Sequence, residues 1–244
     1  MAGALEVKEL TKVIKESILV DRLTFSVQEG ETFGLLGSNG SGKTTTFRML
    51  AGLMGSSSGK ITILGKDRSK IDKKRPEVGF VTQNDSIYET LTVNENLEFF
   101  ASQYGLAGKE TKIRIDELLE QMALTNKKHT LAAELSGGMK KRLNIACSLI
   151  HDPKVILLDE PTVGLDPVVR KDIWRVIEKL HDRKKTVIIT SHYMDEIEHL
   201  CGRVAIMFGG RIVDSGTPEE LKKKYKLKQM EDVFAHLVKP EGSI

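Results

Sequence analysis

A glycine-rich loop, placed between an apolar run and a helical run, constrains the fold of this chain more than any other stretch. The apolar run, Thr32 to Leu36, predicts a buried strand, and Thr45 to Leu53 has the pattern of a helix. Between them stand Gly37, Ser38, Asn39, Gly40, Ser41, Gly42, Lys43 and Thr44. A strand, a glycine loop and a helix start in this order are typical of a phosphate-binding loop.

The chemistry of such a loop comes from its backbone. Glycines let successive N–H groups converge on one point, and the first turn of the helix adds partial positive charge there. Triphosphate oxygens fit this arrangement, and we predict that Lys43 bridges the β- and γ-phosphates while the Thr44 hydroxyl ligates Mg²⁺. The alternative is a glycine-rich turn that matches by chance, and the flanking strand and helix argue against it.

Composition narrows the class of protein. A length of 244 residues allows a substantial core, and a net charge of +3 gives no indication of nucleic acid as the main partner. Cys147 and Cys201 lack metal-ligand spacing, which predicts core thiols in a reducing compartment. We expect no signal peptide, and no apolar run approaches the ~20 residues of a membrane span, so a membrane role would need another chain.

Period-2 patterns before and after the loop predict short strands, and the chain then becomes helical. The strands cover Leu5–Leu10, Thr24–Val27, Lys60–Leu64 and Val78–Thr82, the first two antiparallel and half-buried. The basic stretch Lys66 to Arg75 is expected to be a solvated connection. Helices are predicted over Val93–Tyr104 and Thr111–Met122, and a third begins at Ser136.

The last third returns to an α/β pattern. The continuous apolar run Val155 to Leu158 predicts a strand buried on both faces of a parallel sheet. A helix, a second buried strand, a hairpin turn and a helical tail follow at Val169–Leu180, Thr186–Thr190, Gly209–Gly210 and Pro218–Val238. The basic run Lys222 to Lys228 in the tail is interpreted as a solvated helix face, with contact to anionic lipid as the alternative.

These patterns predict the α/β class: a P-loop NTPase core with a mostly parallel sheet, an N-terminal antiparallel β subdomain and an inserted helical lobe. We assign residues 1–84 and 153–217 to the core, 85–152 to the lobe and 218–244 to a C-terminal helical tail, within a single domain.

Two acids end the apolar strand, where ligands of open α/β sheets bind. Asp159 could hold Mg²⁺, and Glu160 could orient or deprotonate an attacking water. The alternative is a pair of acids that cap the next turn beside Pro161.

Ser136, Gly137 and Gly138 begin a helix with two glycines in its first turn, at a cost of up to about 1 kcal/mol each. A second anion-binding helix terminus with Ser136 as N-cap would explain them, and a loop that merely needs glycine is the alternative.

His192 follows the strand Thr186–Thr190 and could donate a hydrogen bond to a γ-phosphate oxygen, although a cap or a surface role would also fit. Gln83 could reach Mg²⁺ or water with its amide.

In this order, the residues resemble the ATP-binding cassette family of ATPases over nearly the whole chain. The corresponding motifs are Walker A (GSNGSGKTT, through Thr45), the Q-loop (Gln83), the signature (LSGGM), Walker B (VILLDEP), the D-loop (GLDP, with Asp166) and the switch histidine (His192). The resemblance implies an ATP- and Mg²⁺-dependent ATPase. It also implies a head-to-tail dimer with a second copy or a homologous subunit, in which the signature of one subunit completes the site of the other.

Within the family, the signature with its following KKRL and the segment LTVNENLEFFASQYGL resemble the exporter branch. This implies an integral membrane permease as partner and a peripheral position on the cytoplasmic face of the membrane. A soluble regulatory ATPase without a membrane partner is the alternative, and the sequence names no cargo.

Two positions depart from the family pattern. Ile14 stands where an aromatic residue usually stacks on adenine, and Met139 stands where the signature usually has Gln. Because stacking on a base is worth about 1–3 kcal/mol, we predict weak or poorly base-selective nucleotide binding. We interpret Met139 as a mark of the subfamily.

Overall fold

The computed structural model describes residues 3–70 and 77–238. They form two compact units, one made of residues 1–70 and 186–244 and the other of residues 71–185, with their described parts treated separately below. Residues 71–75 of the predicted solvated connection lie outside the described residues.

The first unit contains an antiparallel sheet with the strand order β2-β1-β4-β5. Its strands are β1 (Gly3–Ile14), β2 (Ser17–Gln28), β4 (Ser58–Ile63) and β5 (Lys66–Asp67). The predicted antiparallel strands are confirmed, but β1 and β2 are longer than the alternation indicates. The physical reason is that their register shifts between Val7 and Leu10, where Glu9 has a φ of 50°, so the period-2 pattern breaks inside the strand.

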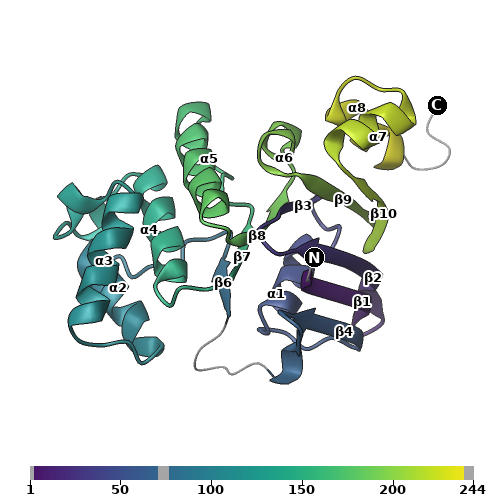
Figure 1. The fold of residues 1–244 in the computed structure, drawn as a ribbon. Helices are drawn as coiled ribbons and strands as arrows, with labels where there is room; N and C mark the ends of the chain where they lie inside the picture. The colour runs from purple at the N-terminus through teal and green to yellow at the C-terminus, as the bar shows by residue number, and fades with distance from the viewer. Residues whose placement is uncertain (1–2, 71–76, 239–244) are drawn as a thin grey trace. The chain divides into compact units, whose positions relative to one another are not determined.

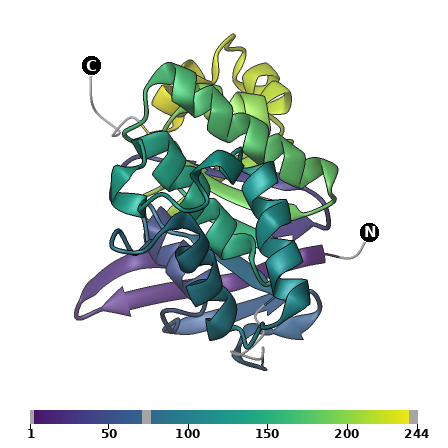
Figure 2. The same cartoon turned by 90° about the vertical axis from the view of Figure 1, so that its left-hand side faces the viewer.

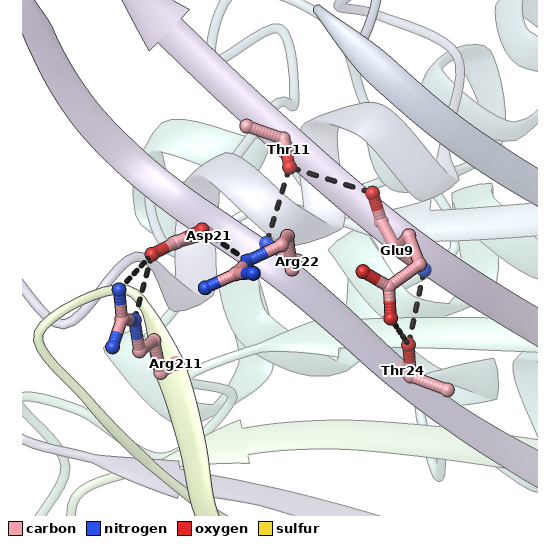
Figure 3. A network of polar contacts seen from close by, with 6 residues as sticks. All are labelled: Glu9, Thr11, Asp21, Arg22, Thr24 and Arg211. Atoms are coloured by element: carbon pink, nitrogen blue, oxygen red, sulfur yellow. Dashed lines mark hydrogen bonds and ion pairs between the residues drawn. The ribbon is translucent and has the colours of Figure 1, made fainter.

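Threonine hydroxyls support the irregular backbone of this hairpin (Figure 3). The Glu9 N–H donates to Thr24 Oγ1 at 3.0 Å, and the Arg22 N–H donates to Thr11 Oγ1 at 3.1 Å. Arg22, like Glu9, has a positive φ, 47°. Backbone groups that leave the strand ladder at a bulge are thus bonded by side chains.

The same unit contains four further strands in the order β10-β9-β3-β8. Strand β3 (Thr32–Gly37) pairs in parallel with β8 (Thr186–Ser191) and with β9 (Arg203–Phe208), and every residue of β3 and β8 is buried. Strand β10 (Arg211–Gly216) runs antiparallel to β9. Gly209 and Gly210 have φ values of 55° and 79°, which confirms the predicted two-residue hairpin turn.

The α-helices among the described residues of this unit, labelled in Figure 1, are α1 (Lys43–Leu50), α6 (Met194–Leu200), α7 (Pro218–Tyr225) and α8 (Met230–Val238). The predicted helical tail is therefore two helices. Helix α6 was not expected from the sequence, and its Ile197 Cδ1 would lie 2.8 Å from a Cβ on Gly34 of β3. Only glycine at that position lets the helix pack so closely on the strand.

The second unit pairs two parallel strands, β6 (Val78–Val81) and β7 (Val155–Asp159). Its helices, seen from two directions in Figures 1 and 2, are α2 (Val93–Gln103), α3 (Lys109–Gln121), α4 (Gly137–Leu149) and α5 (Pro167–Asp182). Thr92 caps α2 through a capping box with Glu95, which fixes where the first helix begins. The predicted helices are thus present, whereas the lobe boundaries at 85 and 152 stay predictions.

Both cysteines are buried and unpaired, as predicted. Within the described ranges, no helix has the length and apolar character needed to cross a membrane.

Candidate functional site

The glycine loop joins β3 to α1 and is shaped by close packing. A Cβ on Gly37 would overlap Ser41 Oγ and lie 2.7 Å from the Met207 carbonyl oxygen. Gly42 has a φ of 101°, and a Cβ there would lie 2.6 Å from the Leu19 carbonyl oxygen. Larger residues at either position would push the loop away from the strands beneath it.

Lys43 is buried and turns back over the loop. Its Nζ donates to the carbonyl oxygens of Gly37 at 2.7 Å and Ser38 at 3.1 Å. The ammonium group is therefore held at the centre of the loop, while Asn39 and Gly40 at its tip are exposed. Thr44 and Thr45, in the first turn of α1, are half-buried.

A polar atom in this loop supports a ligand-binding interpretation. Ser41 Oγ is buried and has no hydrogen-bond partner among the described residues. Because buried hydroxyl groups are almost always bonded, a ligand with polar oxygens fits this position. The loop thus fits phosphate in backbone geometry, in charge and in its unsatisfied hydroxyl.

His192 follows β8, whose last residue, Ser191, pairs with Leu36 of β3. Since β3 and β8 are parallel neighbours, His192 and the glycine loop lie at the same edge of this sheet. The imidazole lies against the ring of Tyr193, with 4.2 Å between centroids. The shared sheet edge of His192 and the glycine loop is thus an observation within the first unit, and the predicted hydrogen bond of His192 to phosphate stays a prediction.

The second unit places two acids and an amide at the ends of its neighbouring strands. Asp159 is 1% exposed and Glu160 is 6% exposed. Gln83, which follows β6, donates from Nε2 to Glu160 Oε2 at 3.4 Å. Glu160 also has a φ of 48°, a left-handed conformation that costs energy for a non-glycine residue and is concentrated at functional sites.

The next helix does not use these acids as its cap. Asp166 is the N-cap of α5, and its Oδ1 accepts hydrogen bonds from the N–H groups of Val168 at 3.0 Å and Val169 at 3.1 Å. The alternative that Asp159 and Glu160 cap the turn beside Pro161 concerns the segment before this helix and stays a prediction. The predicted contact of Asp166 with nucleotide stays a prediction beside this capping role.

Ser136 is the N-cap of α4, as predicted, and its Oγ accepts from the Met139 N–H at 3.4 Å. The two glycines after it differ. A Cβ on Gly138 would overlap Cγ1 of Val169 on α5, whereas a Cβ on Gly137 would meet only Leu165 Cδ2, at 3.8 Å. Packing within the chain therefore accounts for Gly138 and leaves Gly137 without a structural reason.

Ile14 ends β1 at the hairpin tip, where it is 41% exposed. The first aromatic residue after it, Phe25, stacks on Phe33 with 5.6 Å between centroids and is thus used in packing. One arrangement was missed from the sequence: the buried Lys141 and Asn144 of α4 contact the segment that follows Gln83. The available signal was weak: Lys141 and Asn144 lie three residues apart, which places them on one helix face, while Lys141 itself stands in a basic run.

Within the first unit, a glycine loop that follows a parallel strand and begins a helix is typical of a P-loop nucleotide-binding domain. Within the second unit, a carboxylate and an amide lie at neighbouring strand ends, a combination that suits phosphoryl transfer. The model of the family described as "ABC transporter" matches residues 20–163. The chain belongs to the ABC transporter family.

Curated relatives agree with this assignment. The chain is 42% identical over 219 residues to "Probable multidrug ABC transporter ATP-binding protein YbhF" of Escherichia coli (strain K12), an alignment that covers 89% of this chain and 38% of that protein. It is 41% identical over 221 residues to "Linearmycin resistance ATP-binding protein LnrL" of Bacillus subtilis (strain 168), covering 89% and 70%. "Nod factor export ATP-binding protein I" of Neorhizobium galegae is 41% identical, covering 89% and 63%. The chain thus spans little more than a third of YbhF.

Solved structures share the fold. An ATP-binding subunit of an ABC transporter has a TM-score of 0.86 at 28% identity and covers 97% of this chain and 100% of that chain. A dimeric ATP-binding cassette bound to ADP and Pi has a TM-score of 0.78 at 26% identity, covering 87% and 98%. The predicted α/β fold, the resemblance to export-type ATP-binding subunits and the class of ATPase domain are confirmed.

Proposed function

We propose that this chain is the ATP-hydrolysing subunit of an ABC transporter that drives export through a separate membrane-spanning partner. The observation that carries the proposal is the buried Glu160, held in a left-handed conformation with the Gln83 amide 3.4 Å from its carboxylate. An acid placed in this way at a strand end suits a group that accepts a proton from an attacking water.

We assign a role to each site residue from the charge of its side chain and from the hydrogen-bond donors or metal ligands that it offers. Lys43 offsets the negative charge of the β- and γ-phosphates, and the loop N–H groups orient them. Oxygen ligands suit Mg²⁺, so we assign the ion to Thr44, Gln83 and Asp159. When bound, Mg²⁺ would neutralise charge on the phosphates. Glu160 takes the proton of the attacking water.

His192 donates a hydrogen bond to a γ-phosphate oxygen and so stabilises the charge that develops there. Ser136, Gly137 and Gly138 of a second copy donate to the same phosphate from the other side, and Asp166 belongs to the same interface. The exposed Gly137 supports this assignment, because packing within one chain does not require a glycine there.

The transporter part of the proposal rests on the relatives named for multidrug transport and for Nod factor export. It places the chain at the cytoplasmic face of the membrane, bound to an integral membrane permease. Co-purification in detergent with a polytopic membrane protein is the expected result. Recovery of an active ATPase with no membrane protein from native membranes and cytosol would favour the soluble regulatory alternative.

The ATPase part is tested with Glu160→Gln. This variant should bind ATP, dimerise and release phosphate at least about a hundredfold more slowly, because the amide cannot accept the proton. Hydrolysis by the unchanged chain should also rise faster than linearly with protein concentration. Wild-type turnover in the variant would remove Glu160 from its role, and a strictly linear rise from a proven monomer would refute the shared site.

A further inference from the structure

A lysine on the signature helix α4 is buried against the segment that carries Gln83. The side chain of Lys141 is 5% exposed, and its Nζ lies 3.0 Å from Asp85 Oδ1. Nζ also donates a hydrogen bond of 2.9 Å to the backbone carbonyl oxygen of Gln83. Burying an ammonium group is costly unless it is paired, so these contacts define where the lysine must lie.

Asn144, one turn later on the same face of α4, holds the segment at two further points. Its Nδ2 donates to Asp85 Oδ1 at 3.3 Å, and its Oδ1 accepts from the Ser86 N–H at 3.4 Å. Residues three apart on a helix project to the same side. Lys141 and Asn144 together therefore attach residues 83–86 to the helix that begins with the signature.

Gln83 connects this attachment to the proposed catalytic acid. Its carbonyl oxygen accepts from Lys141, and its side-chain Nε2 donates to Glu160 Oε2 at 3.4 Å. A continuous set of hydrogen bonds thus runs from α4 to Glu160 inside the second unit. A shift of the backbone at residue 83 would move the amide away from the carboxylate.

We propose that Lys141 is a positioning residue for hydrolysis: it fixes the backbone of Gln83 to α4 so that the Gln83 amide stays against Glu160. The inference rests on the proposed function, because it assumes that Glu160 serves the attacking water. Lys141 is not part of the glycine loop, so its loss should lower kcat by much more than it raises the KM for ATP.

The test compares the unchanged chain with a double variant. Asp85→Asn with Lys141→Met removes the donor to Gln83 together with its acidic partner, so no buried charge is left unpaired. The double variant should have a kcat about tenfold lower than the unchanged chain, with KM within about twofold, since a hydrogen bond from a charged group is lost. Lys140→Met removes a neighbouring lysine that pairs with Glu89 instead, at 2.5 Å, and should keep wild-type kcat.

Lys141→Gln is the second variant in case the double variant does not fold. Its neutral side chain ends one bond closer to the helix, so the charged donor to the Gln83 carbonyl is lost and a fall of kcat is again expected. Wild-type kcat in a folded variant that lacks the donor would overturn the inference, as would a fall of kcat matched by an equal rise in KM. Failure of the unchanged chain to hydrolyse ATP, or wild-type turnover by Glu160→Gln, would instead overturn the proposed function, and this inference with it.

Discussion

The imidazole of His151 stacks on the phenol ring of Tyr104, with 4.0 Å between the ring centroids and 27° between the ring planes. Its Nε2 lies 3.3 Å from the Val78 carbonyl oxygen, and Nδ1 is buried without a hydrogen-bond partner in the described structure. Burial lowers the pKa of His151 to about 4. The hydrogen bond to Val78 and the charge of Asp152 raise the pKa of His151, but by less than burial lowers it. The positive charges of Arg114 and Lys185 lower this pKa further.

This histidine should make the fold sensitive to mild acid. The unfolded chain takes up the proton near pH 6.5 and the folded chain only near pH 4, so the unfolded state binds more protons between these values. The contribution of this group to stability is therefore complete above about pH 6.5 and is lost as the pH falls toward 4, a loss of about 3 kcal/mol in total. Urea unfolding of His151→Phe, which keeps a ring against Tyr104, should show a smaller decline. Identical pH slopes in both proteins would contradict this assignment.

The two signature glycines should respond differently to alanine. In Gly138→Ala the new methyl overlaps Val169, a branched side chain with little rotamer freedom, so we expect a loss of about 1–3 kcal/mol. Gly137→Ala has room for the methyl and should match or exceed wild-type stability. If Gly137 faces the nucleotide of a second copy, its variant should nevertheless lose ATPase activity. Chemical unfolding and phosphate release measured on both variants separate packing from function.

The hairpin of β1 and β2 should depend on its threonine hydroxyls. Thr24→Val removes the acceptor of the Glu9 N–H and should cost about 0.5–1.5 kcal/mol, since a bulge leaves that group without a strand partner. Thr24→Ser keeps the hydroxyl and serves as the matched control. A valine variant as stable as the serine variant in thermal unfolding would show that water replaces the hydroxyl at no cost.

The chain should discriminate poorly between ATP and GTP, because Ile14 stands where an aromatic side chain would stack on the base. An aliphatic side chain that is 41% exposed offers no aromatic face for adenine. We expect dissociation constants for ATP and GTP within about tenfold of each other, and Ile14→Tyr should tighten ATP binding by about 1 kcal/mol or more. Fluorescence titration with both nucleotides measures this, and a strong preference for ATP in the unchanged chain would count against it.

Sequence patterns predicted the elements that rely on local chemistry. Continuous apolar runs identified β3, β7 and β8, and the glycine pair at 209 and 210 identified the hairpin turn. The bulge at Glu9 was not predictable, because a left-handed residue there depends on a hydroxyl from another strand. Helix α6 was missed because it is short and mostly polar, with only Glu196 and Ile197 buried.

The residues of the candidate site likewise fall into two groups, those that the sequence predicted and those that only the structure revealed. The glycine loop and the paired acids follow strand ends and were found from the sequence alone. Lys141 was not, because a basic residue in a basic run is usually solvated, and its burial follows from the tertiary position of Asp85. The packing reason for Gly138 also requires the helix that carries Val169. Contacts between distant segments were thus the part that periodicity could not supply.

Lys43 binds the carbonyl oxygens of its own loop, and this contact bears on the rate of nucleotide exchange. A loop closed by its own lysine is ordered when the domain folds, so the loss of chain entropy precedes the encounter with nucleotide. Nucleotide binding then adds contacts to a loop that already has its structure. Replacement of ADP by ATP should accordingly be limited by departure of the old nucleotide, with no slow conformational phase assigned to the loop.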